Sequence, residues 1–109
     1  MIARHPNPAA VLDYEIAQEK AATLGRLGRD LENALNLLAA FDAAGPPSPA
    51  HGRAERRALV AQAGYALWLL VVQREVLGLR NTGQLMRDYR VPAEVQACMG
   101  MLPANQRAG

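Results

Sequence analysis

The chain has 109 residues, of which 50% are apolar and 20% are charged, and its formal net charge is +2. This length accommodates one domain without a second independent core, and the apolar share excludes a disordered tail. Eleven arginines and one lysine against ten acids leave a small positive excess, and this excess is spread along the sequence. Because a nucleic-acid footprint is usually a dense basic patch, we do not expect nucleic acid as a partner.

The first predicted element is a long helix over about residues 8–43. Asn7 can cap its first free amides, and Pro8 suits the first helical position because no hydrogen bond is lost there. Apolar residues then recur at steps of three and four until Gly45 and the two prolines after it end the helix. The recurring residues are Leu12, Ile16, Leu24, Leu27, Leu31, Leu35, Leu38 and Phe41.

Small residues lie close to one face of this helix, namely Ala17, Ala21, Gly25 and Gly28. Two interpretations are open: close approach of another helix, and a kink near residues 25–28. Each glycine destabilises a helix interior by about 1 kcal/mol relative to alanine. We favour close packing.

A second long helix is predicted to begin either at Ser48-Pro49 or after Gly52, and to end near Leu77, where Gly78 provides the stop. Its central run, YALWLLVV, is apolar all round, which indicates burial on more than one side. The longest apolar run, residues 59–72, is too short to span a bilayer, so we expect no membrane contact.

Two short helices are predicted in the C-terminal part. Asn81 with Gln84 resembles a capping pair for the first of them. Val91-Pro92 is predicted to close that helix, since the residue before a proline is pushed out of helical geometry. The last helix runs from about 92 to 99, with Gly100 as its stop.

These elements predict an all-α fold, a long helical hairpin plus two short C-terminal helices, in a single domain over residues 1–109. Residues 1–7 and 103–109 are expected to be flexible ends, and residues 45–52 the hairpin connection. Burial worth about 25 cal/mol per Å² has to offset an ordering cost of about 1–2 kcal/mol per residue, so a hairpin cannot leave its leucines exposed. We therefore expect two copies to form a homodimeric four-helix bundle, with another protein as a further candidate partner.

Residues 81–100, NTGQLMRDYRVPAEVQACMG, resemble a helix-turn-helix, which raises a DNA-binding alternative. That motif has a small residue early in its first helix, glycine at the turn and an apolar residue in its recognition helix. With Arg90 at the turn, the other two positions hold Met86 and Gln96. The second helix also carries Glu94 and no basic residue, so DNA phosphates would repel it.

A further alternative concerns the arginines at the joint between the second long helix and the tail. They could bind a small anionic ligand near a helix N-terminus, or pair with Glu75, Asp88 and Glu94 and hold the tail in place. We favour pairing, because arginine suits such partly buried pairs. Arg74 shares a face with apolar residues and is therefore either a buried pair or a site residue. The candidate ligand or partner cluster comprises Arg74, Glu75, Arg80, Arg87, Asp88, Tyr89 and Arg90.

No arrangement of residues predicts catalysis, a metal or a cofactor. His5 and His51 lack metal-ligand spacing, and no Glu-x-x-His motif supports a di-metal bundle. Cys98 lies in an apolar segment, where a thiol is usually a small buried hydrophobe. As the only cysteine it can form no intramolecular disulfide, and with no signal peptide in the N-terminal segment this favours a cytoplasmic location.

The segment QREVLGLRNTGQLMRDYRVPAEVQACMG resembles the C-terminal half of a family of short, helical bacterial proteins of unknown function. The resemblance lies in the Arg-Asp-Tyr-Arg-Val-Pro block, Arg87 to Pro92, after a glycine-terminated helix. It implies a small stand-alone helical protein and no activity. Our leading hypothesis is a non-catalytic homodimeric protein-interaction or scaffold module.

Overall fold

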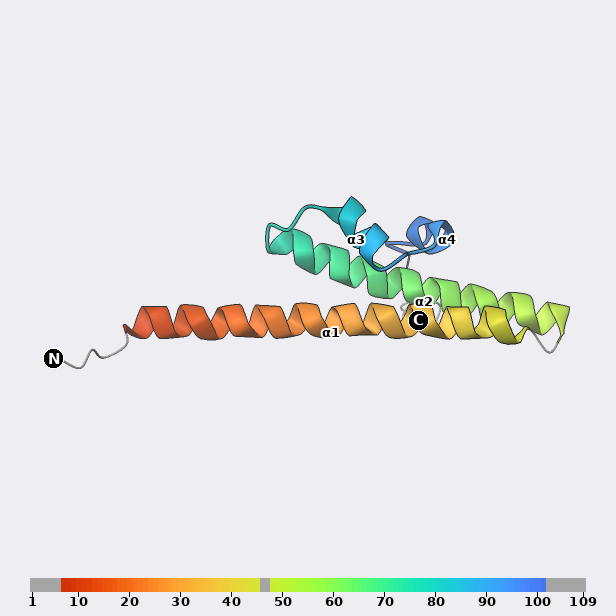
Figure 1. Cartoon of the computed structure of the whole chain (residues 1–109), viewed down its shortest axis with the longest axis horizontal. Helices are drawn as coiled ribbons and strands as arrows, with labels where there is room; N and C mark the ends of the chain where they lie inside the picture. Colours follow the sequence, from red (N-terminus) through yellow and green to blue (C-terminus); the bar gives the residue numbers. More distant parts are fainter. Residues whose placement is uncertain (1–6, 46–47, 102–109) are drawn as a thin grey trace.

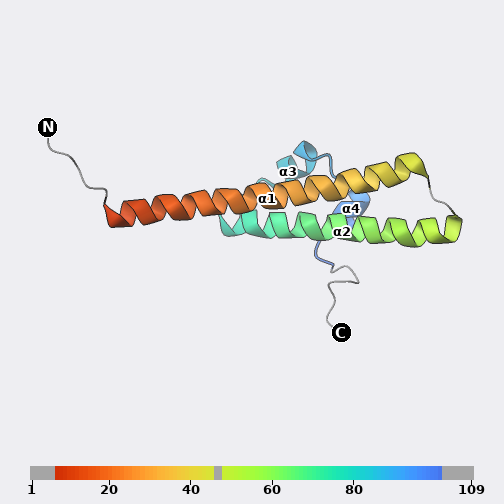
Figure 2. The same cartoon turned by 90° about the horizontal axis from the view of Figure 1, so that it is seen from below.

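The computed structural model describes residues 7–45 and 48–101, which form four helices and no strand. The helices are α1 (Pro8–Ala44), α2 (Pro49–Val76), α3 (Thr82–Asp88) and α4 (Ala93–Ala97). α1 and α2 run side by side in opposite directions, and α3 and α4 lie on one side of this hairpin (Figures 1 and 2). The predicted all-α fold is confirmed. The expected flexible ends, 1–7 and 103–109, lie outside the described residues except for Asn7.

Both long helices begin at a cap that the sequence predicts. The Asn7 side chain accepts a hydrogen bond from the backbone N–H of Ala9 at 3.0 Å. The Ser48 hydroxyl accepts one from the backbone N–H of His51 at 3.4 Å. α2 therefore begins at Ser48-Pro49 and not after Gly52, so the connection is shorter than residues 45–52.

α3 ends in a turn that places an arginine in a left-handed conformation. The backbone N–H of Arg90 donates to the carbonyl of Arg87, and that of Val91 donates to the carbonyl of Met86. These two hydrogen bonds require a positive φ at the residue that makes the turn, and φ is 52° at Arg90. Gly78 makes the corresponding turn after α2, with a φ of 82°. The left-handed Arg90 makes the turn, so α3 stops before the Val91-Pro92 pair that was predicted to close it.

Replacing Arg90 by glycine should stabilise the fold. We expect Arg90→Gly to raise the free energy of unfolding by about 0.5–1 kcal/mol, because glycine adopts a positive φ without a Cβ penalty. Urea unfolding measures the change. Gly78→Ala is the control of opposite sign, and it should lower the free energy of unfolding by about 1 kcal/mol. A lower midpoint for Arg90→Gly would mean that the arginine side chain makes contacts that outweigh the strain.

The core lies between α1 and α2 and is completed by the two short helices. α1 supplies two of its buried apolar residues, α2 supplies five, and the segment after α2 supplies three. These residues are Leu31, Leu38, Val60, Ala63, Leu67, Leu70, Val71, Leu85, Val91 and Val95. The YALWLLVV run is thus covered by α1 and by the tail, while Val72 at its end remains exposed.

The small-residue face of α1 is used only in part. α1 is helical without interruption, so no break occurs near residues 25–28. The Tyr89 hydroxyl occupies the space that a Cβ on Gly28 would take, so Gly28 makes room for a side chain and not for the predicted close approach of another helix. Ala17 and Ala21 are exposed, so the prediction is wrong for them within a single chain.

Gly64 allows α4 to lie against α2. A Cβ at this position would lie 2.9 Å from the Cβ of Cys98 and 3.1 Å from its backbone carbon and oxygen. Real Cβ atoms essentially never approach another atom to within 3.0 Å, and distances of 3.1 Å are rare, so the missing side chain is what lets the end of α4 reach the surface of α2.

α1 extends well beyond the end of α2 (Figure 1). Every residue from 8 to 22, a segment of about 22 Å that we call the arm, is exposed. The arm carries four large apolar side chains, with exposed fractions of 40% for Val11, 56% for Leu12, 65% for Tyr14 and 42% for Ile16. Within residues 7–45 and 48–101, no other helix covers these four side chains.

Candidate functional site

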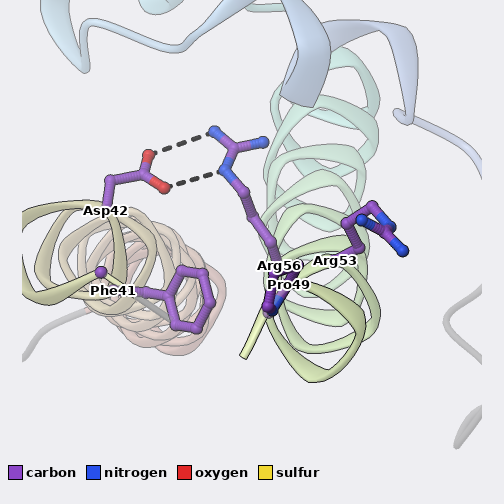
Figure 3. Close-up of a pocket in the computed structure, with 7 residues that line it drawn as sticks. Phe41, Asp42, Pro49, Arg53 and Arg56 are labelled. Atoms are coloured by element: carbon purple, nitrogen blue, oxygen red, sulfur yellow. Dashed lines mark hydrogen bonds and ion pairs between the residues drawn. The ribbon is translucent and has the colours of Figure 1, made fainter. Parts of the chain in front are cut away.

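Arg56 of α2 joins three helices near the hairpin end of the molecule. Its guanidinium donates to both carboxylate oxygens of Asp42 on α1, at 2.8 and 3.1 Å. It also donates to both carboxylate oxygens of Glu94 on α4, at 2.8 and 2.6 Å. Figure 3 shows the guanidinium facing Asp42. Such two-pronged contacts fix geometry as well as charge, so one side chain sets the position of α4 relative to the hairpin.

These ion pairs shift the pKa values of their members. The hydrogen bond from Arg56 lowers the pKa of Asp42 and that of Glu94 below their ordinary values. In return, the hydrogen bonds to Glu94 and Asp42 raise the pKa of Arg56. Because all three side chains are partly exposed, solvent screens their attraction and its main effect is to orient α4.

Acid should weaken this three-way contact. Since the folded state lowers the pKa of both carboxylates, their contribution is complete above the ordinary pKa and is lost as the pH falls through the folded values. We expect the free energy of unfolding to fall more steeply between about pH 5 and pH 2 in the wild type than in Arg56→Met. Urea unfolding across this range tests the prediction, and parallel pH curves would contradict it.

A pocket of about 270 Å³ opens beside Arg56 at the end of the hairpin. In Figure 3 the Phe41 ring lies between the two helices, and the Arg53 side chain points away from Asp42. The volume is below the usual range of small-molecule sites, about 300–1,000 Å³. Asp42 and Arg56 already bind each other. The pocket is lined by Phe41, Asp42, Gly45, Pro49, Gly52, Arg53 and Arg56.

A larger groove of about 490 Å³ runs between α2 and α4. Arg53 and Arg57 contribute exposed cations, Val60 contributes a buried apolar side chain, and Cys98 adds a half-buried thiol. No polar or charged side chain of the described residues is buried. The groove therefore offers open, solvated cations without the enclosed polar groups that fix a ligand's orientation.

The structure divides the predicted joint cluster into two groups. Asp88, Tyr89 and Arg90 lie together at the end of α3, where they line a pocket of about 380 Å³ with residues of α1. Arg87 joins this group through Gln84, whose side chain accepts a hydrogen bond from Arg87 at 3.0 Å and donates one to Asp88 at 2.6 Å.

The other three members lie at the end of α2 and just after it. Arg74 is half-buried, while Glu75 and Arg80 are exposed. The favoured pairing of the joint arginines with nearby acids is wrong for Glu94, which binds Arg56. α4 folds back along α2, so Glu94 meets that helix about 27 Å from Arg74. Among the described residues, Arg56 forms the salt bridges, with Asp42 and with Glu94.

α4 offers little surface for reading DNA. It is five residues long, Val95 at its centre is fully buried, and Glu94 is bound to Arg56. The side-chain amide of Gln96 donates to the carbonyl of Val91 at 3.0 Å. The one side chain that could read a base edge is therefore engaged within the chain.

The central residue of the ion-pair cluster, Arg56, is absent from the predicted cluster, and so is Asp42. Both lie within a few turns of the hairpin connection, where antiparallel helices place opposite charges side by side, and this signal could have identified the pair. The contact with Glu94 depends on how the tail folds back, which no local pattern specifies.

The described residues also define two limits on the chemistry. Within residues 7–45 and 48–101, no group of three His, Cys, Asp or Glu side chains is placed to hold a metal ion. None of the helices in those ranges combines the length and the apolar composition needed to cross a membrane.

Comparison with known proteins identifies a family without an assigned activity. Residues 1–107 match the family described as "Family of unknown function (DUF6665)", which confirms the resemblance to an uncharacterised family. No curated protein and no solved structure matches the chain. Its function therefore has to be argued from the geometry.

Proposed function

Since the chain belongs to DUF6665, a family of unknown function, we propose from its geometry that it is a non-catalytic, homodimeric interaction module that serves as a scaffold. The observation that carries the proposal is the arm, a helical segment with four exposed large apolar side chains. An isolated helix of about 15 residues is marginal in water, so a partner that covers the arm would stabilise it.

The use of polar groups supports an interaction role over catalysis. Arg56, Asp42 and Glu94 bind one another and hold the helices together. The groove beside them is open to solvent, whereas catalytic groups are usually held in enclosed, water-poor sites. A cytoplasmic location is part of the proposal, because the single Cys98 suits a reducing compartment.

The oligomeric state tests this function directly. We expect native mass spectrometry and analytical ultracentrifugation to show a particle of twice the chain mass of 11.8 kDa at micromolar concentration. A protein that remains monomeric at millimolar concentration would refute the homodimer. The same mass spectrum reports any small molecule that co-purifies with the protein.

A second candidate function is binding of a small anion by Arg90 at the α1–α3 pocket, against the charge of Glu32 and Asp88, which also line it. One observation favours this function. Arg90 has a left-handed backbone conformation that usually belongs to glycine, and it lies beside that pocket. Strained residues of this kind cluster at binding sites. Under this function, Arg90→Gly would abolish anion binding while raising stability, and Gly83→Ala on the same helix would leave binding unchanged.

A further inference from the structure

The end of α2 exposes a second apolar surface, close to the point where the arm projects beyond the hairpin (Figure 1). Val72, Val76 and Leu79 form this surface, which we call the α2-end surface, with exposed fractions of 39%, 73% and 42%. We propose that the partner is a second copy of the chain whose arm binds the α2-end surface, and that the contact is reciprocal. This inference rests on the proposed homodimer and specifies where its two chains meet.

The two surfaces match in spacing. Leu12 and Ile16 lie four residues apart, which places them on one face of α1 one turn from each other. Val72 and Val76 have the same separation on α2. Val11 lies about 100° around the helix from Leu12 and falls outside this face. An arm can therefore lie along the end of α2 with two apolar side chains of each helix in contact.

Because α1 extends past the end of α2, two chains can make the same contact with each other on both sides. The arm projects beyond the end of α2 (Figure 1). A twofold axis perpendicular to the long helices near this point reverses the second chain, so each arm runs along the other chain's α2. The same patches meet on both sides, and the assembly closes as a dimer.

The distribution of charge favours an arm bound to the partner's α2 over two arms bound to each other. The arm has three carboxylates, Asp13, Glu15 and Glu19, against the single Lys20. Residues 72–90, which contain the α2-end surface, have four arginines against two acids. Two arms side by side would bring like charges together, whereas an arm beside the partner's α2 end brings opposite charges together.

The size of the contact is adequate for a weak specific dimer. Each arm is about 22 Å long and presents a strip about 10 Å wide. Two such strips and the surfaces that they cover bury on the order of 1,000 Å² in total, which is the lower limit for a specific interface. A dissociation constant in the micromolar range is expected.

Mixed-disulfide trapping tests the arrangement. Because the twofold axis makes each arm parallel to the partner's α2, Leu12 faces Val72 and Ile16 faces Val76. Leu12→Cys and Val72→Cys are made in separate chains, each with Cys98→Ala, and the two proteins are mixed and oxidised; Ile16→Cys with Val76→Cys is the second pair in the same register. We expect disulfide-linked pairs that contain one chain of each type. Val11→Cys mixed with Val72→Cys is the matched control and should give at least about tenfold less product, because disulfides require Cα atoms within about 7 Å.

The outcomes separate this inference from the proposed function. A dimer in solution without mixed cross-links from either cysteine pair would overturn the arrangement and leave the homodimer standing. Cross-linking of Leu12→Cys chains with each other alone would instead indicate paired arms. A protein that is monomeric throughout would defeat the proposed homodimer itself.

Substitution on the arm provides an independent measurement. We expect Leu12→Asp and Ile16→Asp each to weaken the dimer by at least about 30-fold, because each places a charge at the centre of the contact. Val11→Asp should weaken it by less than about threefold. All three side chains are exposed in the single chain, so unfolding of the monomer should be unchanged. Equal effects at all three positions would contradict the proposed face.

Discussion

Leu67→Ala is expected to lower the free energy of unfolding by about 3 kcal/mol, the largest effect of any single truncation that we anticipate. Leu67 is fully buried within the cluster that joins α1, α2 and the tail. Alanine would remove apolar surface from the core and leave a cavity. The three surrounding helices cannot collapse far enough to fill it. Urea unfolding followed by circular dichroism measures the change.

Leu37→Ala is the matched control on α1, because Leu37 is a leucine of similar helical context that is 56% exposed. Its effect should stay within about 0.5 kcal/mol. Both variants need the same low protein concentration, since dimerisation adds to apparent stability by mass action. Similar losses for the two leucines would mean that the core is not where the structure places it.

Gly64→Ala should destabilise the protein by about 2 kcal/mol although alanine is the better helix former. The added Cβ meets the backbone of Cys98, which cannot move away without lifting α4 from α2. We expect faster amide hydrogen exchange in α4 as well as a lower unfolding midpoint.

Gly25→Ala is the control of opposite sign. The nearest atom to its added Cβ is the end of the flexible Arg29 side chain at 3.3 Å, which can move aside. The substitution should therefore stabilise the protein by about 0.5–1 kcal/mol through helix propensity alone. A gain in stability at both glycines would show that α4 does not depend on the missing side chain of Gly64.

The helices could be predicted from sequence because their ends are encoded locally. Asn7 and Ser48 satisfy free amides within three residues, and the glycines at 45 and 78 take up the positive φ that follows a helix. Hydrophobic periodicity then established that the elements are helices and that two of them are long. These signals act over one or two turns, which is the range that a single sequence reveals.

The candidate site was predicted much less well, because it depends on contacts between distant residues. The hydrogen bonds between Arg56 and Glu94 link positions 38 residues apart. Periodicity also placed Leu12 and Ile16 in the same series as Leu31 and Leu38, yet the former pair is exposed and the latter buried. A repeat of apolar residues shows that a face will be covered without showing which chain covers it.

The path of the tail has a consequence for how the chain folds during synthesis. α1 and α2 make contacts across a short connection, so they can associate as soon as α2 has emerged from the ribosome. Glu94 and Val95 are the 18th and 19th residues after Val76. During that interval the side of α2 that will contact α4, with Val60 and Gly64 at its surface, has no cover. Until that segment has folded back, the nascent hairpin is open to association with other chains through this side of α2.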